Sequence, residues 1–396
     1  MSVWDALVGQ DEAVAALQGA AQAAADLTHD RPVAPGAMTH AWLFIGPPGS
    51  GRSVAAQAFA AALQCERDDD IGCGECPACR TVRAGSHPDV RAVVPDGLSI
   101  SVDEMRAVVA ASGRLPALGR WQVVVIEDAD RLTERASNAL LKAVEEPAPR
   151  TVFLLCAPSS HPDDVSVTIR ARCRLVPLRT PPAAAVAAVL QRDGLDAAMA
   201  DWAAAAGQGH IGRSRRLVRD ADARDRRAEV LAIPASLTTL RACLAAADHL
   251  VGAAEAEAAA MSSELDSDET EALQTALGAG GTGKGTATMP RGTAGVIKDL
   301  ERRQKSRATR AQRDALDRAL VDLAAFYRDV LLVHSGSLVA PAHPDFADDV
   351  RAVALRVNPA GVLQRLDAVL ACREALELNV KPRIAVEAMT AALRLP

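Results

Sequence analysis

The sequence predicts an α/β domain with a parallel sheet, followed by helical domains. Three short apolar runs, AWLFIG, QVVVIED and TVFLLCAP, alternate with longer helical patterns within residues 1–178, as buried parallel strands and their crossover helices do. Only 3% of the 396 residues are aromatic, so alanine-rich aliphatic packing is expected, which favours helices. A chain of this length exceeds the usual capacity of one hydrophobic core, so two or three domains are expected.

The domain boundaries are predicted from where the strand pattern ends. The β signal disappears after RLVPLRTPP, whose double proline can neither continue a helix nor donate to a strand. We therefore expect a small helical lid at residues 179–226 and a helical domain at 227–396. A disordered loop is predicted at residues 263–295, because its Gly/Thr-rich part has little apolar surface. Its GTGKGT string lacks a preceding strand and is interpreted as linker rather than as a phosphate loop.

The charge balance and hydropathy exclude some classes of partner. A formal net charge of −6 speaks against a protein that coats nucleic acid by bulk electrostatics, so we expect protein partners. No apolar run reaches membrane-spanning length, and the N-terminus lacks a basic region followed by an apolar core. The expectation is a cytoplasmic protein with no membrane contact.

The string GPPGSGRS has the length, glycines and closing serine of a phosphate-binding loop, but an arginine stands where such a loop has lysine. Glycines let backbone N–H groups crowd around phosphates, and the following helix adds a partial positive charge. A guanidinium is wide and forked where an ammonium is compact, so we expect the exchange to impair catalysis more than binding. The candidate nucleotide-binding residues of the loop are Gly46, Pro47, Gly49, Ser50, Gly51, Arg52 and Ser53.

Glu127 and Asp128, at the end of the strand QVVVI, complete the candidate nucleotide site. Nucleotide hydrolases of this type carry Asp first, for the magnesium shell, and Glu second, for the attacking water, so the order here is reversed. Moving both carboxylates by about 1 Å can lower the rate on the order of a hundredfold. Asp130 is interpreted as a surface acid or a cap of the next helix.

Four of the eight cysteines cluster with the spacing C-x7-C-x2-C-x2-C: Cys65, Cys73, Cys76 and Cys79. Four thiolates at tight-turn spacing suit tetrahedral zinc, and no coordination position remains open, so the predicted zinc is structural. A redox role for Cys76 and Cys79 is the alternative. His87, which follows the cluster, is expected to cap local backbone rather than to bind metal.

Five strings resemble one family in their order and spacing: GPPGSGRS, VVVIEDADRLT, SNALLKAVEEP, TVFLLCAP and TIRARCRLVPL. They are similar to bacterial clamp-loader subunits of the AAA+ class, and within that class most of all to the delta prime subunits of DNA polymerase III. NALLKAVEEP, residues 138–147, is the most specific of them. The resemblance implies a AAA+ domain with a zinc module at residues 65–79, a lid, and a collar domain that joins a ring of five subunits.

The resemblance also implies that Arg172 serves a neighbouring subunit. The family has a Ser-Arg-Cys motif whose arginine contacts the γ-phosphate of ATP held by the neighbour, and the motif here reads Ala171, Arg172, Cys173. A guanidinium suits that role because it is always charged and meets phosphate oxygens through two N–H groups. The alternative is that Arg170, Arg172 and Arg174 form a solvated basic edge.

Two further family positions depart from the pattern of an active ATPase. Sensor 1 falls on Ala157 and sensor 2 on Gly212, and neither side chain can hydrogen-bond a phosphate. With Arg52 and the reversed acids, these departures predict a subunit that supports another subunit's ATPase without hydrolysing ATP itself. Whether ATP and Mg²⁺ bind to the loop is left open.

The implied function is to help load the sliding clamp onto primed DNA, as a scaffold and arginine donor in a heteropentamer with delta and tau/gamma subunits. No nucleotidyltransferase carboxylate constellation is visible, so DNA-directed polymerase chemistry is expected elsewhere in the holoenzyme. Three alternatives stay open: a tau/gamma-like ATPase, a free-standing AAA+ enzyme that uses Arg52, and a zinc-dependent DNA-binding protein. The basic run at residues 298–313 is interpreted as a solvated helix face rather than a DNA contact.

Overall fold

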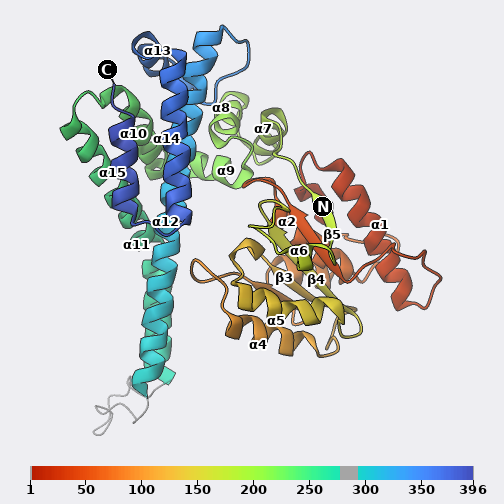
Figure 1. The fold of residues 1–396 in the computed structure, drawn as a ribbon. Coiled ribbons are helices and arrows are strands. Elements are labelled where there is room, and N and C mark those ends of the chain that lie inside the picture. Colours follow the sequence, from red (N-terminus) through yellow and green to blue (C-terminus); the bar gives the residue numbers. More distant parts are fainter. Residues whose placement is uncertain (1, 277–292, 396) are drawn as a thin grey trace. The chain divides into compact units, whose positions relative to one another are not determined.

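The computed structural model describes residues 2–276 and 293–395. The chain divides into two compact units, each considered by itself (Figure 1). The first comprises Met1–Pro95 and Ser99–Arg215, and the second comprises Asp96–Leu98 and Arg216–Pro396. The predicted division into three domains stays a prediction; the residues of the predicted lid up to Arg215 group with the first unit.

The first unit is built on a five-stranded sheet in which all neighbouring strands are parallel. The strand order is β2-β3-β4-β1-β5. The strands are β1 (Ala41–Ile45), β2 (Val90–Val93), β3 (Gln122–Ile126), β4 (Thr151–Ala157) and β5 (Arg174–Pro177). The predicted α/β class is confirmed, and the three apolar runs form β1, β3 and β4.

Apolar side chains on both faces of the sheet hold the helices of the first unit. Alternate residues of a strand point to opposite faces. Phe44 of β1 therefore joins a core with α1 and α2, whereas Leu43 joins a core with α4 and α5. The helices are η1 (Val3–Ala6), α1 (Asp11–Thr28), α2 (Arg52–Leu63), α3 (Pro77–Arg83), α4 (Val102–Ser112), η2 (Ala129–Arg131), α5 (Glu134–Glu145), α6 (Val167–Arg170), α7 (Ala183–Arg192), α8 (Ala197–Gly207) and α9 (Ile211–Arg219), which ends beyond the unit's boundary.

The described part of the second unit is helical, as predicted. Its helices are α10 (Ala221–Ser236), α11 (Leu240–Ala276), α12 (Thr293–Ser335), η3 (Pro344–Phe346), α13 (Ala347–Arg356), α14 (Pro359–Glu377) and α15 (Pro382–Ala392). They enclose one apolar core in which Phe326 and Tyr327 are fully buried. Within residues 2–276 and 293–395, no helix has the length and apolar character needed to cross a membrane.

The prediction of a disordered loop at residues 263–295 is wrong at both ends. Residues 263–276 form the last turns of α11, and α12 begins at Thr293. Polar pairs across the two helices explain the extra length: Gln304 Nε2 donates to the Asp266 carbonyl over 3.0 Å, and Arg307 contacts Glu269 at 2.5 Å. The central part of that loop and the GTGKGT string lie outside the described residues.

The basic run of α12 is largely engaged by neighbouring groups of its own unit. Arg307 pairs with Asp266 and Glu269 of α11, and Arg302 pairs with Asp299 at 2.7 Å. These contacts support the interpretation of residues 298–313 as a helix face. Because acids of the same unit pair with some of the basic residues, fewer positive charges could contact a nucleic acid than the number of basic residues suggests.

Replacing Arg307 by Ala should loosen the outer ends of α11 and α12. The loss of two carboxylate contacts is expected to destabilise this segment by about 1 kcal/mol, which speeds amide hydrogen exchange in residues 263–276 by roughly fivefold. The hydrogen bond from Arg307 lowers the pKa of Glu269. The stabilisation from the Arg307–Glu269 contact is therefore complete above the ordinary Glu pKa of about 4.3. It is lost as the pH falls through the lowered pKa of Glu269.

Arg302→Ala is the matched control, because Arg302 is 77% exposed and pairs only within its own helix. An equal increase in exchange for both variants would contradict the assignment.

Candidate functional site

The predicted phosphate loop, residues 46–53, connects β1 to α2. Gly46 donates its N–H to the Ala157 carbonyl over 3.4 Å, which ties the loop to the end of β4. Gly49 and Gly51 have φ values of +87° and +90°, a left-handed backbone that residues with a Cβ rarely adopt. Gly51 is also the N-cap of α2, so the unpaired N–H groups of that helix start at the loop. The strand, loop and helix predicted from the sequence are therefore all present.

Arg52, the first residue of α2, turns its guanidinium back onto the loop. Its Nη1 donates to the Gly46 carbonyl oxygen over 2.8 Å. That bond directs the residue that replaces the family's lysine toward a backbone carbonyl. Ser53, the next residue, keeps the hydroxyl that such loops use for magnesium.

His210, between α8 and α9, packs directly against the loop. A Cβ atom on Gly49 would lie 2.8 Å from the His210 Cβ and 3.1 Å from its Cα, closer than real Cβ contacts come. His210 is held in place because its Nδ1 accepts the Arg213 N–H over 3.2 Å. Next to Gly49, Ser50 is 2% exposed, and its hydroxyl has no hydrogen-bond partner in the described chain. The loop is thus closely covered at Gly49.

The predicted acids lie at the carboxyl end of β3. Glu127 directly follows β3, and the Asp128 carboxylate lies 3.9 Å from Arg131 Nε. The Cys156 thiol in β4 is affected by these charged groups. Burial raises its pKa to about 12, and the charges of four further residues also change this pKa. These are Arg52, which lowers that pKa, and Glu127, Asp128 and Asp130, which raise it. Ser53 and Glu127 line one cavity, so the structure brings the end of the predicted loop and the first acid together.

Asp130 belongs to this cluster, although the sequence analysis interpreted it only as a surface acid or a helix cap. Burial and the charge of Asp128 raise the pKa of its carboxyl, and its Oδ1 is buried with no hydrogen-bond partner among the described residues. Its interpretation as a helix cap is wrong, because the Thr133 hydroxyl caps α5 by accepting the Ala136 N–H over 3.3 Å. The sequence feature that could have indicated Asp130 as a site residue is its position as the third acid within four residues of the end of the buried strand β3.

The two sensor positions carry no polar side chain. Ala157 ends β4 and is fully buried. Gly212 lies in the first turn of α9, beside Arg213. These two positions therefore offer no side-chain hydrogen bond to a phosphate or a water.

Arg172 lies at the opposite edge of the sheet. It precedes β5 by two residues, at the amino end of that strand, whereas the phosphate loop follows the carboxyl end of β1. Because all the strands are parallel, the five residues of β1 separate the two edges by about 13 Å. The candidate arginine and the candidate cradle of this chain therefore face different ends of the sheet.

Two contacts hold the Arg172 guanidinium. Its Nη2 lies 2.5 Å from Oε1 of Glu145, the last residue of α5, and its Nη1 donates to the Thr168 carbonyl over 2.8 Å. The side chain remains 38% exposed. A guanidinium has five N–H donors, so these contacts leave others for a ligand.

The neighbouring arginines are exposed like Arg172 and have partners of their own. Arg170 donates to the Ser160 carbonyl over 3.3 Å. The Arg174 guanidinium lies 5.0 Å from the centre of the Trp42 ring, a cation–π contact.

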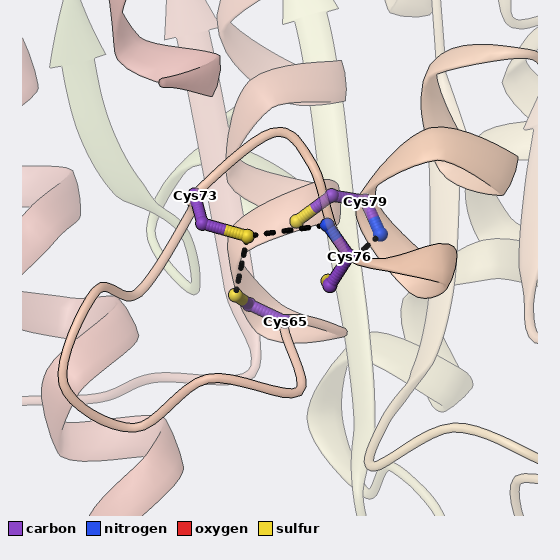
Figure 2. A group of neighbouring side chains, drawn as sticks. All are labelled: Cys65, Cys73, Cys76 and Cys79. Carbon is purple, nitrogen blue, oxygen red and sulfur yellow. Dashed lines mark hydrogen bonds between the residues drawn. The ribbon is translucent and has the colours of Figure 1, made fainter. Parts of the chain in front are cut away.

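The four predicted metal ligands converge (Figure 2). The sulfur atoms of Cys65, Cys73, Cys76 and Cys79 all lie within 4.8 Å of one another, and all four residues are buried. The Cys65 and Cys73 sulfurs are 3.8 Å apart. With a Zn–S bond of about 2.3 Å, two sulfurs of a tetrahedral site are also about 3.8 Å apart. The cluster therefore fits a four-coordinate metal ion such as zinc.

Backbone groups and the N-terminal turn support the cluster. The Cys76 N–H points at the Cys73 sulfur and the Cys79 N–H at the Cys76 sulfur, each over 3.4 Å, an arrangement that stabilises thiolates. Gly72 has φ +85°, and a Cβ there would lie 2.7 Å from Nε1 of Trp4, so only glycine fits against that ring.

All eight cysteines are free in this structure. The hydrogen bond between Cys65 and Cys79 lowers the pKa of Cys65 to about 4 and raises the pKa of Cys79. His87 caps local backbone as expected: its Nδ1 accepts the Asp89 N–H over 3.2 Å, and burial lowers its pKa.

Known proteins resemble the part of the chain that carries these sites. Residues 22–182 match the family described as DNA polymerase III, delta subunit. The DNA polymerase III subunit delta prime of Pseudomonas aeruginosa is 41% identical over 137 residues, which are 34% of this chain and 41% of that protein. The similarity to these DNA polymerase III subunits therefore covers the segment that carries the candidate nucleotide and metal sites.

A DNA polymerase III subunit with another name is almost as similar. The DNA polymerase III subunit tau of Bacillus subtilis is 37% identical over 138 residues, 34% of this chain and 24% of that protein. Among solved structures, the RuvB Holliday junction branch migration motor of Thermotoga maritima matches 54% of this chain and 62% of its own, with a TM-score of 0.38 and 17% identity. The match covers about two fifths of the delta prime relatives, and residues 1–21 and 183–396 lie outside the matched family region.

The cysteine cluster should hold one metal ion per chain. Cys73→Ser and Cys76→Ser each remove one of four ligands, so the ion should be lost and the thermal unfolding midpoint should fall by several degrees. Elemental analysis of the purified protein measures the first effect and calorimetry the second.

Cys173→Ser makes the same chemical change outside the cluster and should leave the metal content unchanged. Wild-type protein without stoichiometric metal, or variants that keep it, would contradict the site.

Proposed function

We propose that this chain is the delta prime subunit of a DNA polymerase III clamp loader, in which it contributes a scaffold and one arginine, and hydrolyses no ATP itself. The observation that carries the proposal is the placement of Arg172 at the edge of the sheet opposite the phosphate loop. Because the length of β1, about 13 Å, separates the two edges, Arg172 is directed away from a phosphate bound at the loop, and a neighbouring subunit could bring its own nucleotide to the edge with Arg172.

The contacts of Arg52 support the loss of hydrolysis in the chain's own site. Its guanidinium donates to Gly46 of the loop, so the charge that should meet the β- and γ-phosphates is engaged by backbone. His210 covers the loop at Gly49, where a phosphate would approach the backbone N–H groups. Ala157 offers no hydrogen bond to an attacking water.

The properties of Arg172 support a role in trans. A transferring γ-phosphoryl group develops charge on its oxygens, and an arginine supplied by another protein commonly stabilises it. Arg172 is partly exposed, and its two contacts engage only part of its five donors. A guanidinium in this state can donate to phosphate oxygens without first leaving a buried position.

The proposal also implies the partner subunits of this chain and the sliding clamp as the protein that the complex loads. The helical second unit would join the collar of a heteropentamer with tau/gamma and delta subunits, and the complex would open the sliding clamp and place it on primed DNA. The metal cluster, closed by four cysteines, has no open coordination position and would be a structural zinc site.

A tau/gamma-like ATPase is the second candidate, because the tau relative is 37% identical. Ser53, Glu127 and Asp128 all remain near the loop and could hold magnesium in such an enzyme. The candidates differ in turnover: a tau/gamma-like chain hydrolyses ATP by itself, and the proposed delta prime chain does not.

Arg172→Ala tests the proposal in the reconstituted loader. Assembly should be unchanged, since the side chain lies at the surface, while hydrolysis at the neighbouring ATP site should slow by about a thousandfold and clamp loading should fall with it. Size-exclusion chromatography, single-turnover ATP hydrolysis and a clamp-loading assay measure the three effects.

Arg170→Ala is the matched control, because Arg170 lies two residues away and donates to Ser160. Full loader activity with Arg172→Ala would contradict the proposed function.

A further inference from the structure

Glu145 and Arg172 form an ion pair between two segments that are 27 positions apart in the chain. The Nη2 to Oε1 distance is 2.5 Å, and the two side chains are 38% and 36% exposed. Glu145 ends α5 and belongs to the NALLKAVEEP string, whereas Arg172 follows the short helix α6. The pair therefore connects the most specific sequence motif of the first unit to its candidate arginine.

The stability of α5 does not account for the carboxylate at this position. A negative charge at the C-terminus of a helix lies near the unpaired carbonyls and the negative end of the helix dipole, where it is disfavoured. The residue before the cap of α5 is nevertheless an acid, and its described ion-pair partner is Arg172. The arginine gives this acid a favourable partner that its own helix lacks.

The pair fixes the orientation of the guanidinium rather than simply neutralising it. Glu145 holds one terminal nitrogen, and the Thr168 carbonyl holds the other over 2.8 Å. Two anchors on the two ends of a planar group set the direction of its plane. The backbone beneath is also fixed, because the Arg172 N–H donates to the carbonyl of Ile169, a residue that is 1% exposed.

We infer that Glu145 is a positioning residue for Arg172: it holds the guanidinium so that its remaining donors face a phosphate brought by a neighbouring subunit. The inference rests on the proposed function, since it names the residue through which the trans arginine is aligned. Alignment matters because a displacement of about 1 Å in a catalytic group can change the rate on the order of a hundredfold.

The test uses the complete loader with Glu145→Ala, Glu145→Gln and Arg172→Ala, singly and combined. Glu145→Ala should lower the kcat for hydrolysis at the neighbouring site by about tenfold, with an unchanged KM for ATP. Glu145→Gln should lose less, because its amide oxygen can still accept from Nη2. In the Arg172→Ala background, Glu145→Ala should have no further effect, because the residue acts only through Arg172.

Glu146→Ala is the matched control, since Glu146 is the adjacent exposed carboxylate and forms no ion pair in the described chain. Thermal unfolding of each variant verifies that the first unit is folded. A further loss caused by Glu145→Ala in the Arg172→Ala background, or an equal loss with Glu146→Ala, would indicate a structural role and overturn the inference.

The proposed function and this inference fail in different ways. If Arg172→Ala impairs the loader and Glu145→Ala does not, the positioning role is wrong and the proposed function stands. If Arg172→Ala has no effect, the arginine has no role in trans, and both are overturned.

Discussion

The pairing of β1 with β4 and β5 is the constraint on which both sites of the first unit depend. Ile45 stands opposite Ala157 of β4 and Pro177 of β5, so the carboxyl ends of the three strands lie side by side. The loop after β1 then lies against the end of β4, to which Gly46 donates its N–H. Parallel pairing also directs the amino ends to the opposite edge, where Arg172 precedes β5.

The two edges differ in how their arginines are used. At the carboxyl edge, Arg52 donates to its own loop, and His210 packs against Gly49. At the amino edge, Arg172 is held by Glu145 and Thr168 but stays partly exposed. A cradle engaged by its own chain and an arginine presented at the surface are both consistent with the proposed action on a neighbour's nucleotide.

The sequence predicted what depends on local patterns and missed what depends on distant partners. The metal cluster was predicted in full, because its ligands lie within one short segment. The strand β2 was not singled out, since its Val90–Val93 segment is half exposed and lies at the sheet edge. The helical ends of the predicted loop were missed because Arg307 meets Glu269 only across the α11–α12 pair. The Glu145–Arg172 contact likewise has no signature in the spacing of the two residues.

Equilibrium binding of ATP to the purified chain, in the presence of Mg²⁺ and with turnover followed in the same samples, tests the central claim most directly. Because Arg52 and His210 engage the loop, the account predicts no saturable binding below millimolar ATP and no hydrolysis. Binding at micromolar ATP together with steady turnover that Arg52→Ala abolishes would contradict it, and would make the chain an ATPase in its own right.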